Sequence, residues 1–350
     1  MKQHLLLLFG GRSSEHDISL KSAANVAKAV DTDRYELILV GITKDGRWLL
    51  ADGIGAIADG SYEQGAPCML SADTSDRCLY VFGDEGFRKC PVDVIFPVLH
   101  GLYGEDGTVQ GLFELSGIPY VGPGVLASAV SMDKVYTKII VDRLGIRQAA
   151  YVWVSRGELE RMDETAEKIE KALPYPVFVK PSCAGSSIGV RQAGDRKQLE
   201  EALKEAAKHD AKILIEETIV GRELETAVLE DGGNIVVSGV GEILSAAEFY
   251  DFDAKYNNAE SKTVVGPDLP EGVAEELRGD AERIFRAVGA RGLSRVDFFL
   301  DGQGVVFNEI NTLPGFTAIS MYPMLMEELG IGKRALVQRL IDSAYHRNEH

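Results

Sequence analysis

The sequence predicts a protein of mixed class, α/β and α+β, in which an open parallel α/β sheet at the N terminus precedes a larger α+β region. The apolar run Leu5 to Phe9 leads through two glycines into an amphipathic segment, which is the strand, turn and helix order that opens an α/β unit. Residues 295–315 alternate polar and apolar side chains around a glycine-bearing turn, which is typical of an antiparallel hairpin.

We expect this hairpin to turn through a three-residue loop, 302–304. In that register Val306 opposes Leu300, and Glu309 opposes Asp297. Because side chains alternate between faces, one face gathers four polar groups: Arg295, Asp297, Glu309 and Asn311. The other face is apolar apart from two residues, and it comprises Val296, Phe298, Leu300, Val306 and Ile310, interrupted by Ser294 and Asn308.

The two carboxylates of this polar face predict a cation between them. Opposed carboxylates roughly 5 Å apart repel each other unless positive charge intervenes. A ligand set made only of oxygens, Asp297, Glu309 and the amide of Asn311, suits magnesium better than zinc. The alternative is a surface hairpin in which Arg295 pairs diagonally with one acid while water solvates the other.

Length and composition limit the possible partners. A chain of 350 residues that is 45% hydrophobic is expected to form two or three domains. The net charge of −17 argues against nucleic acid or an anionic membrane as partner. The first apolar run is too short for a signal peptide, so we expect a cytoplasmic protein. The spacing of the four cysteines favours reduced thiols over a zinc site or disulfides.

The N-terminal region is expected to bind ligands at one edge of its sheet. Residues 35–42 and 92–99 supply further strands, and ligands of parallel sheets bind beyond the carboxyl ends of the strands. That edge receives Glu15 and the glycine-rich loop from His100 to Gly107. Glu15 is placed to bind an ammonium group, or it serves only as an acid in the first turn of a helix. Residues 51–86 are expected to be irregular or an excursion at the sheet edge.

The middle of the chain offers a candidate phosphate site. A helix over 132–144 carries Lys134 and Lys138, and the strand 177–180 ends in Lys180 before a loop of small residues and a strand over 188–191. Such a loop can bring backbone N–H groups to phosphate oxygens, although a plain hairpin turn fits as well. After a helix over 195–209, residues 212–217, 222–229 and 235–243 read as one antiparallel sheet. Residues 245–265 read as a lid or binding loop, followed by helices over 271–288 and from about 323.

These motifs together resemble a known family. Lys180 with Gly185, Ser186 and Ser187, then Glu216 and Glu217, then the polar face of the hairpin resemble the ATP-grasp fold. The loop 100–107, Glu15 and residues 253–256 narrow the resemblance to the D-alanine:D-alanine ligase family over essentially the whole chain. It implies an N-terminal domain over 1–126, a central ATP-grasp subdomain over 127–214 and a C-terminal ATP-grasp subdomain over 215–350.

The resemblance implies a reaction and its cofactors. ATP phosphorylates the carboxylate of a first D-alanine, and the amine of a second attacks the acyl phosphate, which makes a precursor of peptidoglycan. Asp297, Glu309 and Asn311 would hold two Mg²⁺ ions, with Mn²⁺ as a substitute, and Lys138, Lys180 and Lys255 would neutralise the remaining phosphate charge. The other implied contacts of ATP are Ser187, Glu216, Glu217, Ile219, Glu223 and Asn308.

The same resemblance assigns the amino-acid sites. Arg295 and the N–H of Gly315 would form the oxyanion site, and Glu15 would bind the first ammonium group. Ser186 and Tyr256 would link Glu15 to the closing loop. His100 would lie near the first carboxylate, with Ser320 and Met321 at the second substrate.

Several alternatives stay open at this level. Tyr256 resembles enzymes that form a peptide rather than an ester, and Met321 favours D-alanine without excluding D-serine, because an apolar pocket rejects a hydroxyl only weakly. Related ligases that join D-alanine to D-serine in glycopeptide resistance share the segments 96–101 and 294–297. A regulatory ATP-binding protein and another carboxylate–amine ligase are the remaining alternatives. The resemblance suggests a homodimer.

Overall fold

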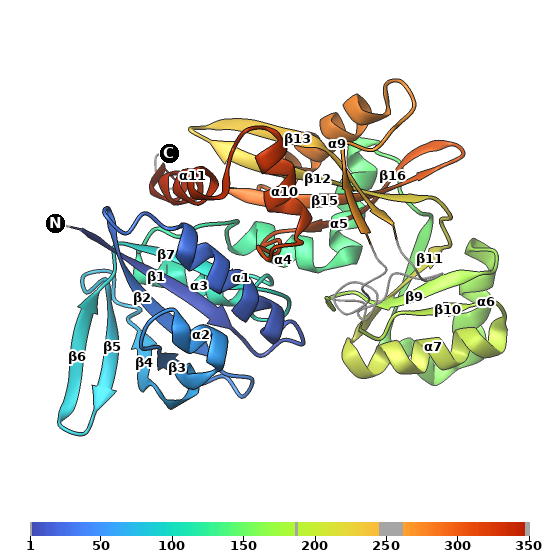
Figure 1. Cartoon of the computed structure of the whole chain (residues 1–350). Helices are drawn as coiled ribbons and strands as arrows, with labels where there is room; N and C mark the ends of the chain where they lie inside the picture. The colour runs from blue at the N-terminus through green and yellow to red at the C-terminus, as the bar shows by residue number, and fades with distance from the viewer. Residues whose placement is uncertain (1, 186–187, 245–261, 347–350) are drawn as a thin grey trace.

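The N-terminal sheet is mixed rather than wholly parallel. The computed structural model describes residues 2–185, 188–244 and 262–346 (Figure 1). Seven strands lie in the order β6-β5-β4-β3-β2-β1-β7, and only the pairs β1–β2 and β1–β7 are parallel. The strands are β1 (Gln3–Gly10), β2 (Tyr35–Ile42), β3 (Trp48–Leu50), β4 (Ala66–Leu70), β5 (Cys78–Gly83), β6 (Gly86–Pro91) and β7 (Val94–Leu99).

The prediction of an irregular segment at 51–86 was therefore wrong. This stretch contains α2 (Gly55–Asp59), a 3₁₀ helix over Ser61–Gln64 and two strands that extend the sheet. The chain turns back over short connections, such as residues 84–85 between β5 and β6. Short connections join antiparallel strands, whereas a parallel neighbour needs a long crossover, so this half of the sheet is antiparallel.

The first strand is buried on both faces. Leu5, Leu7 and Phe9 share a core with α1 (His16–Ala29), while Leu6 and Leu8 pack in the core that contains α3 (Thr108–Ser116). This explains why β1 reads as a continuous apolar run instead of an alternating one.

The central subdomain is a four-stranded antiparallel sheet in the order β10-β9-β11-β8. Helices α6 (Met162–Ala172) and α7 (Arg196–His209) contribute to its core, which confirms the helix predicted at 195–209. The strands are β8 (Tyr151–Ser155), β9 (Val177–Pro181), β10 (Arg191–Ala193) and β11 (Lys212–Glu217), with a 3₁₀ helix over Arg156–Arg161.

Three predictions about this region need correction. β11 pairs with β8 and β9 instead of continuing the next sheet, so a domain boundary after residue 214 falls inside that strand. The second strand of the phosphate-loop hairpin begins at Arg191 rather than at 188. The helix expected over 132–144 is two helices, α4 (Val125–Met132) and α5 (Lys134–Leu144), because Asp133 leaves helical geometry and caps α5.

The C-terminal sheet has five antiparallel strands in the order β14-β13-β12-β15-β16. Helix α9 (Val273–Ala287) covers one face, while α10 (Met321–Glu328) and α11 (Lys333–Tyr345) join its other face to the core of the N-terminal domain (Figure 1). The strands are β12 (Arg222–Asp231), β13 (Asn234–Leu244), β14 (Lys262–Val265), β15 (Leu293–Asp301) and β16 (Gly304–Asn311). The loop predicted at 245–265 therefore ends in a strand, and its remaining residues lie outside the described part.

The hairpin of β15 and β16 reaches its predicted polar register by a different route. Its loop has two residues, because the Asp301 carboxylate accepts the N–H of Gln303 and Asp301 then pairs with Gly304. Val306 consequently opposes Phe299 rather than Leu300. A β-bulge at Asn308 adds the missing residue, so Glu309 still opposes Asp297. The bulge also brings Asn308, predicted on the apolar face, to the lining of a large cavity.

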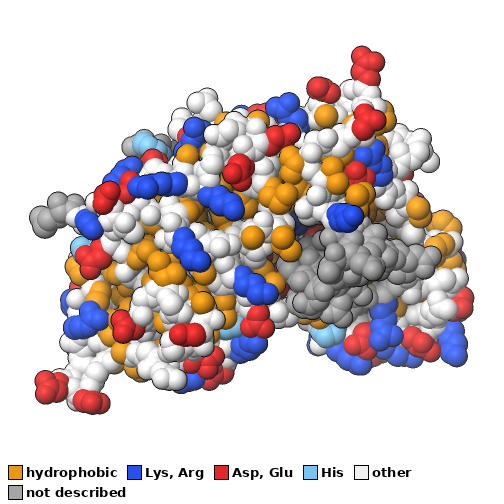
Figure 2. All heavy atoms as spheres, viewed as in Figure 1, with side chains coloured by type: hydrophobic (Ala, Val, Ile, Leu, Met, Phe, Trp, Pro, Cys, Tyr) orange, Lys and Arg blue, Asp and Glu red, His pale blue; other side chains and the backbone are white. Residues whose placement is uncertain are grey.

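Charge is mixed on the face shown in Figure 2, where lysine and arginine side chains are interspersed with aspartate and glutamate. Of the helices that the structure describes, none combines the length and the apolar character that crossing a bilayer requires.

Candidate active site

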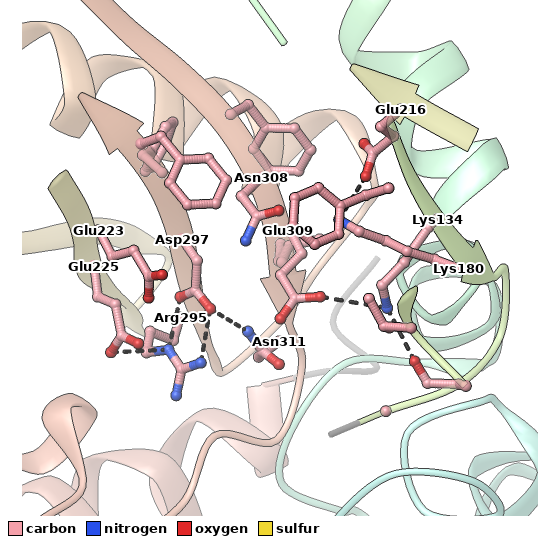
Figure 3. A pocket seen from close by; sticks show the side chains of 18 of the residues that line it. Lys134, Lys180, Glu216, Glu223, Glu225, Arg295, Asp297, Asn308, Glu309 and Asn311 are labelled. Carbon is pink, nitrogen blue, oxygen red and sulfur yellow. Dashed lines mark hydrogen bonds and ion pairs between the residues drawn. The ribbon is translucent and has the colours of Figure 1, made fainter. Parts of the chain in front are cut away.

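A cavity of about 1040 Å³ lies where the three parts of the chain meet. The N-terminal domain lines it with Glu15 and His100, and the central sheet adds Lys180. The C-terminal sheet contributes the polar face of the β15–β16 hairpin (Figure 3). The predicted residues that line this cavity are Glu15, His100, Lys180, Glu216, Glu217, Ile219, Glu223, Arg295, Asp297, Asn308, Glu309, Asn311 and Gly315.

Cations of the chain neutralise both predicted metal-binding carboxylates. The Arg295 guanidinium binds Asp297 through two nitrogens at 2.7 Å each and lies 3.1 Å from Glu225 (Figure 3). Glu309 lies 3.3 Å from the Lys134 ammonium. In this state, therefore, Arg295 pairs with one acid as in the salt-bridge alternative, while a lysine rather than water alone compensates the other.

The donor set fits magnesium chemically. Asp297, Glu309 and Asn311 all line one cavity, and the Asn311 amide donates to Asp297 at 2.9 Å, so the three side chains converge. Among the described residues no three His, Cys, Asp or Glu side chains cluster as a metal site, since this set holds only two such residues and an amide. A small hard cation that keeps waters or phosphate oxygens tolerates so few protein ligands.

A second charge cluster joins α5 to the central sheet. The Glu216 carboxylate lies 2.5 Å from the ammonium groups of both Lys138 and Lys180. Burial alone would raise the pKa of Glu216, but the two lysines outweigh it and lower that pKa to about 2. Lys138 is only 2% exposed and does not line the cavity, which corrects its prediction as a direct phosphate contact. Its charge holds Glu216, and Glu216 holds Lys180 at the cavity wall.

Glycines bring the first domain and the phosphate loop together. A β-carbon at Gly101 would approach Glu15 Oε2 to 2.7 Å, and one at Gly185 would approach it to 2.9 Å. Both distances are too short for a real side chain, so the buried Glu15 carboxylate packs between two glycines from different domains. The small-residue loop after Lys180 thus lies against Glu15, which favours a binding loop over a plain turn.

The residues predicted at the second substrate lie differently. Ser320 accepts the N–H of Thr317 and lies beside Gly315, but it does not line the cavity. Met321 is 3% exposed and packs against Gly241 in the core, because α10 begins there, so its role as a selector of the acceptor is not supported by its position. Four further predicted residues lie outside the described part of the chain: Ser186, Ser187, Lys255 and Tyr256.

Three cavity residues were missed as site residues: Lys134, Glu105 and Glu225. Lys134 also contacts the phosphate loop, since its ammonium donates to the carbonyl of Ala184 at 3.1 Å. Its position one turn before Lys138 was visible in the sequence. Glu225 follows Glu223 by two residues on β12, so strand alternation could have placed it on the same face. Glu105 gave no signal beyond membership of the glycine-rich loop.

Comparison with known proteins agrees with this architecture. A family profile described as the D-ala D-ala ligase N-terminus matches residues 4–123, and one described as the C-terminus matches residues 140–342. A D-alanine–D-alanine ligase from Acetivibrio thermocellus is 48% identical over 99% of this chain and 96% of its own length.

Solved structures are similar over the same extent. The VanG D-Ala:D-Ser ligase from Enterococcus faecalis aligns with a TM-score of 0.89 and 35% identity, covering 98% of this chain and 100% of its own. The D-alanine–D-alanine ligase from Coxiella burnetii aligns with a TM-score of 0.82 and 32% identity, covering 99% and 95%. The two sheets around the cavity form the ATP-grasp ligase fold, preceded by the mixed α/β domain. From its first strand to its last helix, the chain belongs to the D-alanine–D-alanine ligase family.

Proposed function

We propose that this protein joins two D-alanines into D-alanyl-D-alanine, at the expense of ATP, for the synthesis of peptidoglycan precursors. Family membership supports the reaction. The observation that carries the proposal is the single cavity that gathers Glu15, Lys180 and Arg295 from three parts of the chain with the oxygen ligands of the hairpin. An acid for an ammonium group, a lysine for phosphate and an arginine for an oxyanion are the groups that this reaction needs.

The phosphate end of the site lies between the central and C-terminal sheets. Lys180 and Lys134 carry positive charge to opposite sides of it, from β9 and α5. Asp297, Glu309 and Asn311 would hold Mg²⁺, two ions by family resemblance, and the metal charge would neutralise the phosphates when bound. Lys134 and Arg295 then exchange their carboxylate partners for phosphate and substrate. Glu216, Glu217, Ile219, Glu223 and Asn308 are proposed around the nucleotide.

The amino-acid end of the site lies toward the N-terminal domain. Glu15 receives the ammonium group of the first D-alanine, and ATP phosphorylates its carboxylate. The amine of the second D-alanine then forms a bond to the acyl carbon. The carbon–oxygen bond to phosphate breaks with its electron pair on the phosphate, and the amine releases a proton to water. Arg295 and the N–H of Gly315 stabilise the oxyanion formed between these events.

A direct assay tests the proposal. Purified protein with ATP, Mg²⁺ and D-alanine is expected to release one phosphate for each dipeptide formed. Dependence on D-alanine distinguishes a ligase from a regulatory protein that only binds ATP. Tight ATP binding without turnover across a panel of D-amino acids would favour the regulatory alternative, and turnover with other amino acids but none with D-alanine would refute this substrate assignment.

D-serine is the second candidate for the acceptor, because a D-Ala:D-Ser ligase aligns over the full chain. The buried position of Met321 leaves acceptor choice to other residues. We expect D-alanine to be preferred, on the strength of relatives up to 48% identical that are D-alanine–D-alanine ligases. Competition between equal concentrations of the two acceptors, across pH, gives the answer through the ratio of the two dipeptides.

We also propose a cytoplasmic homodimer, in keeping with the family resemblance. Sedimentation of the purified protein at several concentrations measures the oligomeric state, and a concentration-independent monomer would contradict this part of the proposal.

A further inference from the structure

The segment after β16 that contains Gly315 is held to the N-terminal domain by a set of hydrogen bonds. Leu313 is bound at both main-chain groups: its N–H donates to Glu105 Oε1 at 2.8 Å, and its carbonyl lies 2.8 Å from His100 Nδ1. Phe316 is bound in the same way, since its N–H donates to Ser22 Oγ at 3.1 Å and its carbonyl accepts from Asn25 Nδ2 at 2.9 Å.

Only two residues separate these fixed points. Pro314 has no N–H, so the N–H of Gly315 is the one main-chain donor between them. Within the described residues no acceptor takes that N–H, whereas the peptide groups of Leu313 and Phe316 are fully engaged. The hydrogen bonds therefore fix the chain on both sides of a donor that remains available to a ligand.

The bonds also set the state of His100. A carbonyl can only accept, so Nδ1 carries the proton that binds Leu313. Burial lowers the pKa of His100, so the ring is neutral and Nε2 accepts from the Ser22 hydroxyl at 3.2 Å. Ser22 is fully buried, and its oxygen in turn accepts the N–H of Phe316. With both nitrogens engaged, His100 acts here on the main chain rather than on a substrate carboxylate.

Glu105 anchors the other side. Its carboxylate joins two loops, because Oε2 accepts the N–H of Gly101 at 2.8 Å while Oε1 accepts from Leu313. The Thr312 hydroxyl lies 3.4 Å from the same oxygen, Oε1. The loop that follows β7 and the segment that follows β16 are thus linked through one side chain.

We propose that Ser22 and Glu105 are positioning residues for acyl transfer, which act with His100 and Asn25 to keep the Gly315 N–H in one place. The inference rests on the proposed role of Gly315 as an oxyanion donor. Acyl phosphate that waits for a poorly stabilised attack is lost to water, which returns the carboxylate and phosphate without a dipeptide. Loosening the segment should therefore uncouple phosphate release from dipeptide formation.

The primary test is Ser22→Ala, with Ser116→Ala as matched control. Ser116 is equally buried, and its hydroxyl also accepts a main-chain N–H, from Ile118, and donates to a carbonyl, but in α3 away from the cavity. For Ser22→Ala we expect the kcat for dipeptide to fall about tenfold, less than the loss of an entire oxyanion donor. The KM for ATP should stay within about twofold, since the phosphate lysines are untouched. The ratio of phosphate to dipeptide should rise above one.

The control separates this effect from lost stability. Both serine variants should lower the Tm by similar amounts, and only Ser22→Ala should change kcat and the ratio. If Ser22→Ala matched Ser116→Ala in every measurement, the positioning role would be refuted. Should Ser22→Ala fail to fold, Asn25→Ala gives the same test, because Asn25 is only partly buried and holds the same residue, Phe316.

Glu105→Gln tests the second anchor. A glutamine has one acceptor oxygen and cannot accept from both Gly101 and Leu313, so kcat should again fall while the phosphate ratio rises. An unchanged ratio in this variant together with an unchanged Ser22→Ala would overturn the inference. A wild-type protein that makes no dipeptide would instead refute the proposed function.

Discussion

At the scale of single residues, the site is charge-balanced by the chain itself. Asp297 pairs with Arg295 and Glu309 pairs with Lys134, so positive groups sit where metal charge is expected to act. The same carboxylates can serve a metal only if the two cations find other partners. Phosphate and the reacting substrate provide them for Lys134 and Arg295, and Glu225 stays beside Arg295 in either state.

Glu309→Gln tests the metal role. The amide keeps the size of the side chain but is a poor magnesium ligand, so we expect kcat to fall about a hundredfold or more. The partly exposed Glu309–Lys134 pair contributes little to folding, so the free energy of unfolding should change by at most about 1 kcal/mol. Turnover over a range of Mg²⁺ concentrations and urea unfolding measure both effects. Full activity at ordinary Mg²⁺ would contradict the metal assignment, and Glu282→Gln on the exposed face of α9 serves as control.

The stability of the protein should carry a pH signature of Glu105. Although the residue is partly exposed, its carboxyl group is enclosed by protein, and burial, then the charge of Glu15, raises its pKa from 4.5 to about 7. The folded protein therefore binds this proton more tightly than the unfolded chain. Stability from this group is complete below about pH 4.5 and is lost as the pH rises to 7.

Glu105→Gln removes that titration. Relative to the variant, the wild type should lose stability between pH 5 and pH 8, by about 3 kcal/mol to within a factor of about two. Urea unfolding of both proteins at the two pH values gives the difference. An offset that is equal at pH 5 and pH 8 would show that the carboxyl group titrates normally.

At the scale of elements, a bulge and a bridging acid determine the site. The two-residue loop of the β15–β16 hairpin would shift the pairing by one residue, and the bulge at Asn308 restores Glu309 to its place opposite Asp297. On the other side of the cavity, Glu216 of β11 holds Lys138 of α5 and Lys180 of β9. One carboxylate thus fixes three elements.

Glu216→Gln should destabilise the protein strongly. Loss of the carboxylate leaves two buried ammonium groups without compensation, at a cost of about 3–5 kcal/mol near pH 7. Because the pKa of Glu216 is lowered from 4.5 to about 2, its contribution is constant above pH 4.5 and is lost as the pH falls toward 2. The gap between wild type and variant should therefore narrow only below pH 4.5.

Denaturation by urea at pH 7, 5 and 4 follows this gap. Lys138→Met added to Glu216→Gln should recover part of the stability, because it removes one of the uncompensated charges. A double variant less stable than Glu216→Gln alone would argue against this account.

At the scale of the whole molecule, the cavity lies between bodies that share few covalent connections but several side-chain bridges. Lys134 links α5 to Glu309 across the cavity, and Glu105 links the N-terminal loop to the end of β16. A ligand that binds both sides should therefore stabilise the folded state as a unit.

ATP with Mg²⁺ is expected to raise the Tm. At a concentration 100 times Kd, binding contributes about 2.7 kcal/mol, or several degrees for a chain of this size. ATP with a chelator should raise the Tm less, and Glu309→Gln should lose most of the magnesium-dependent part. Thermal unfolding followed by intrinsic fluorescence measures these shifts, and an equal shift with and without Mg²⁺ would exclude metal-assisted binding.

The sequence by itself determined the local patterns and their direct consequences. The buried run of β1, the helix at 195–209 and the concentration of Arg295, Asp297, Glu309 and Asn311 on one face are periodic features of neighbouring residues, and family motifs added the chemistry. Segments joined by short turns were harder to predict, because β4 and β5 lack a strong alternation and their stretch of the sequence therefore predicts irregular structure.

Only the tertiary structure decided which groups meet across long distances in the chain. The pairing of Glu216 with Lys138 and Lys180, of Glu309 with Lys134, and the link from Glu105 to Leu313 all join elements that no periodicity relates. The partner strands of β11 and the burial of Met321 under Gly241 likewise depend on how sheets and helices pack. Periodicity predicts which face a side chain occupies, whereas charge pairing requires two faces to be brought together, and packing of the domains alone does that.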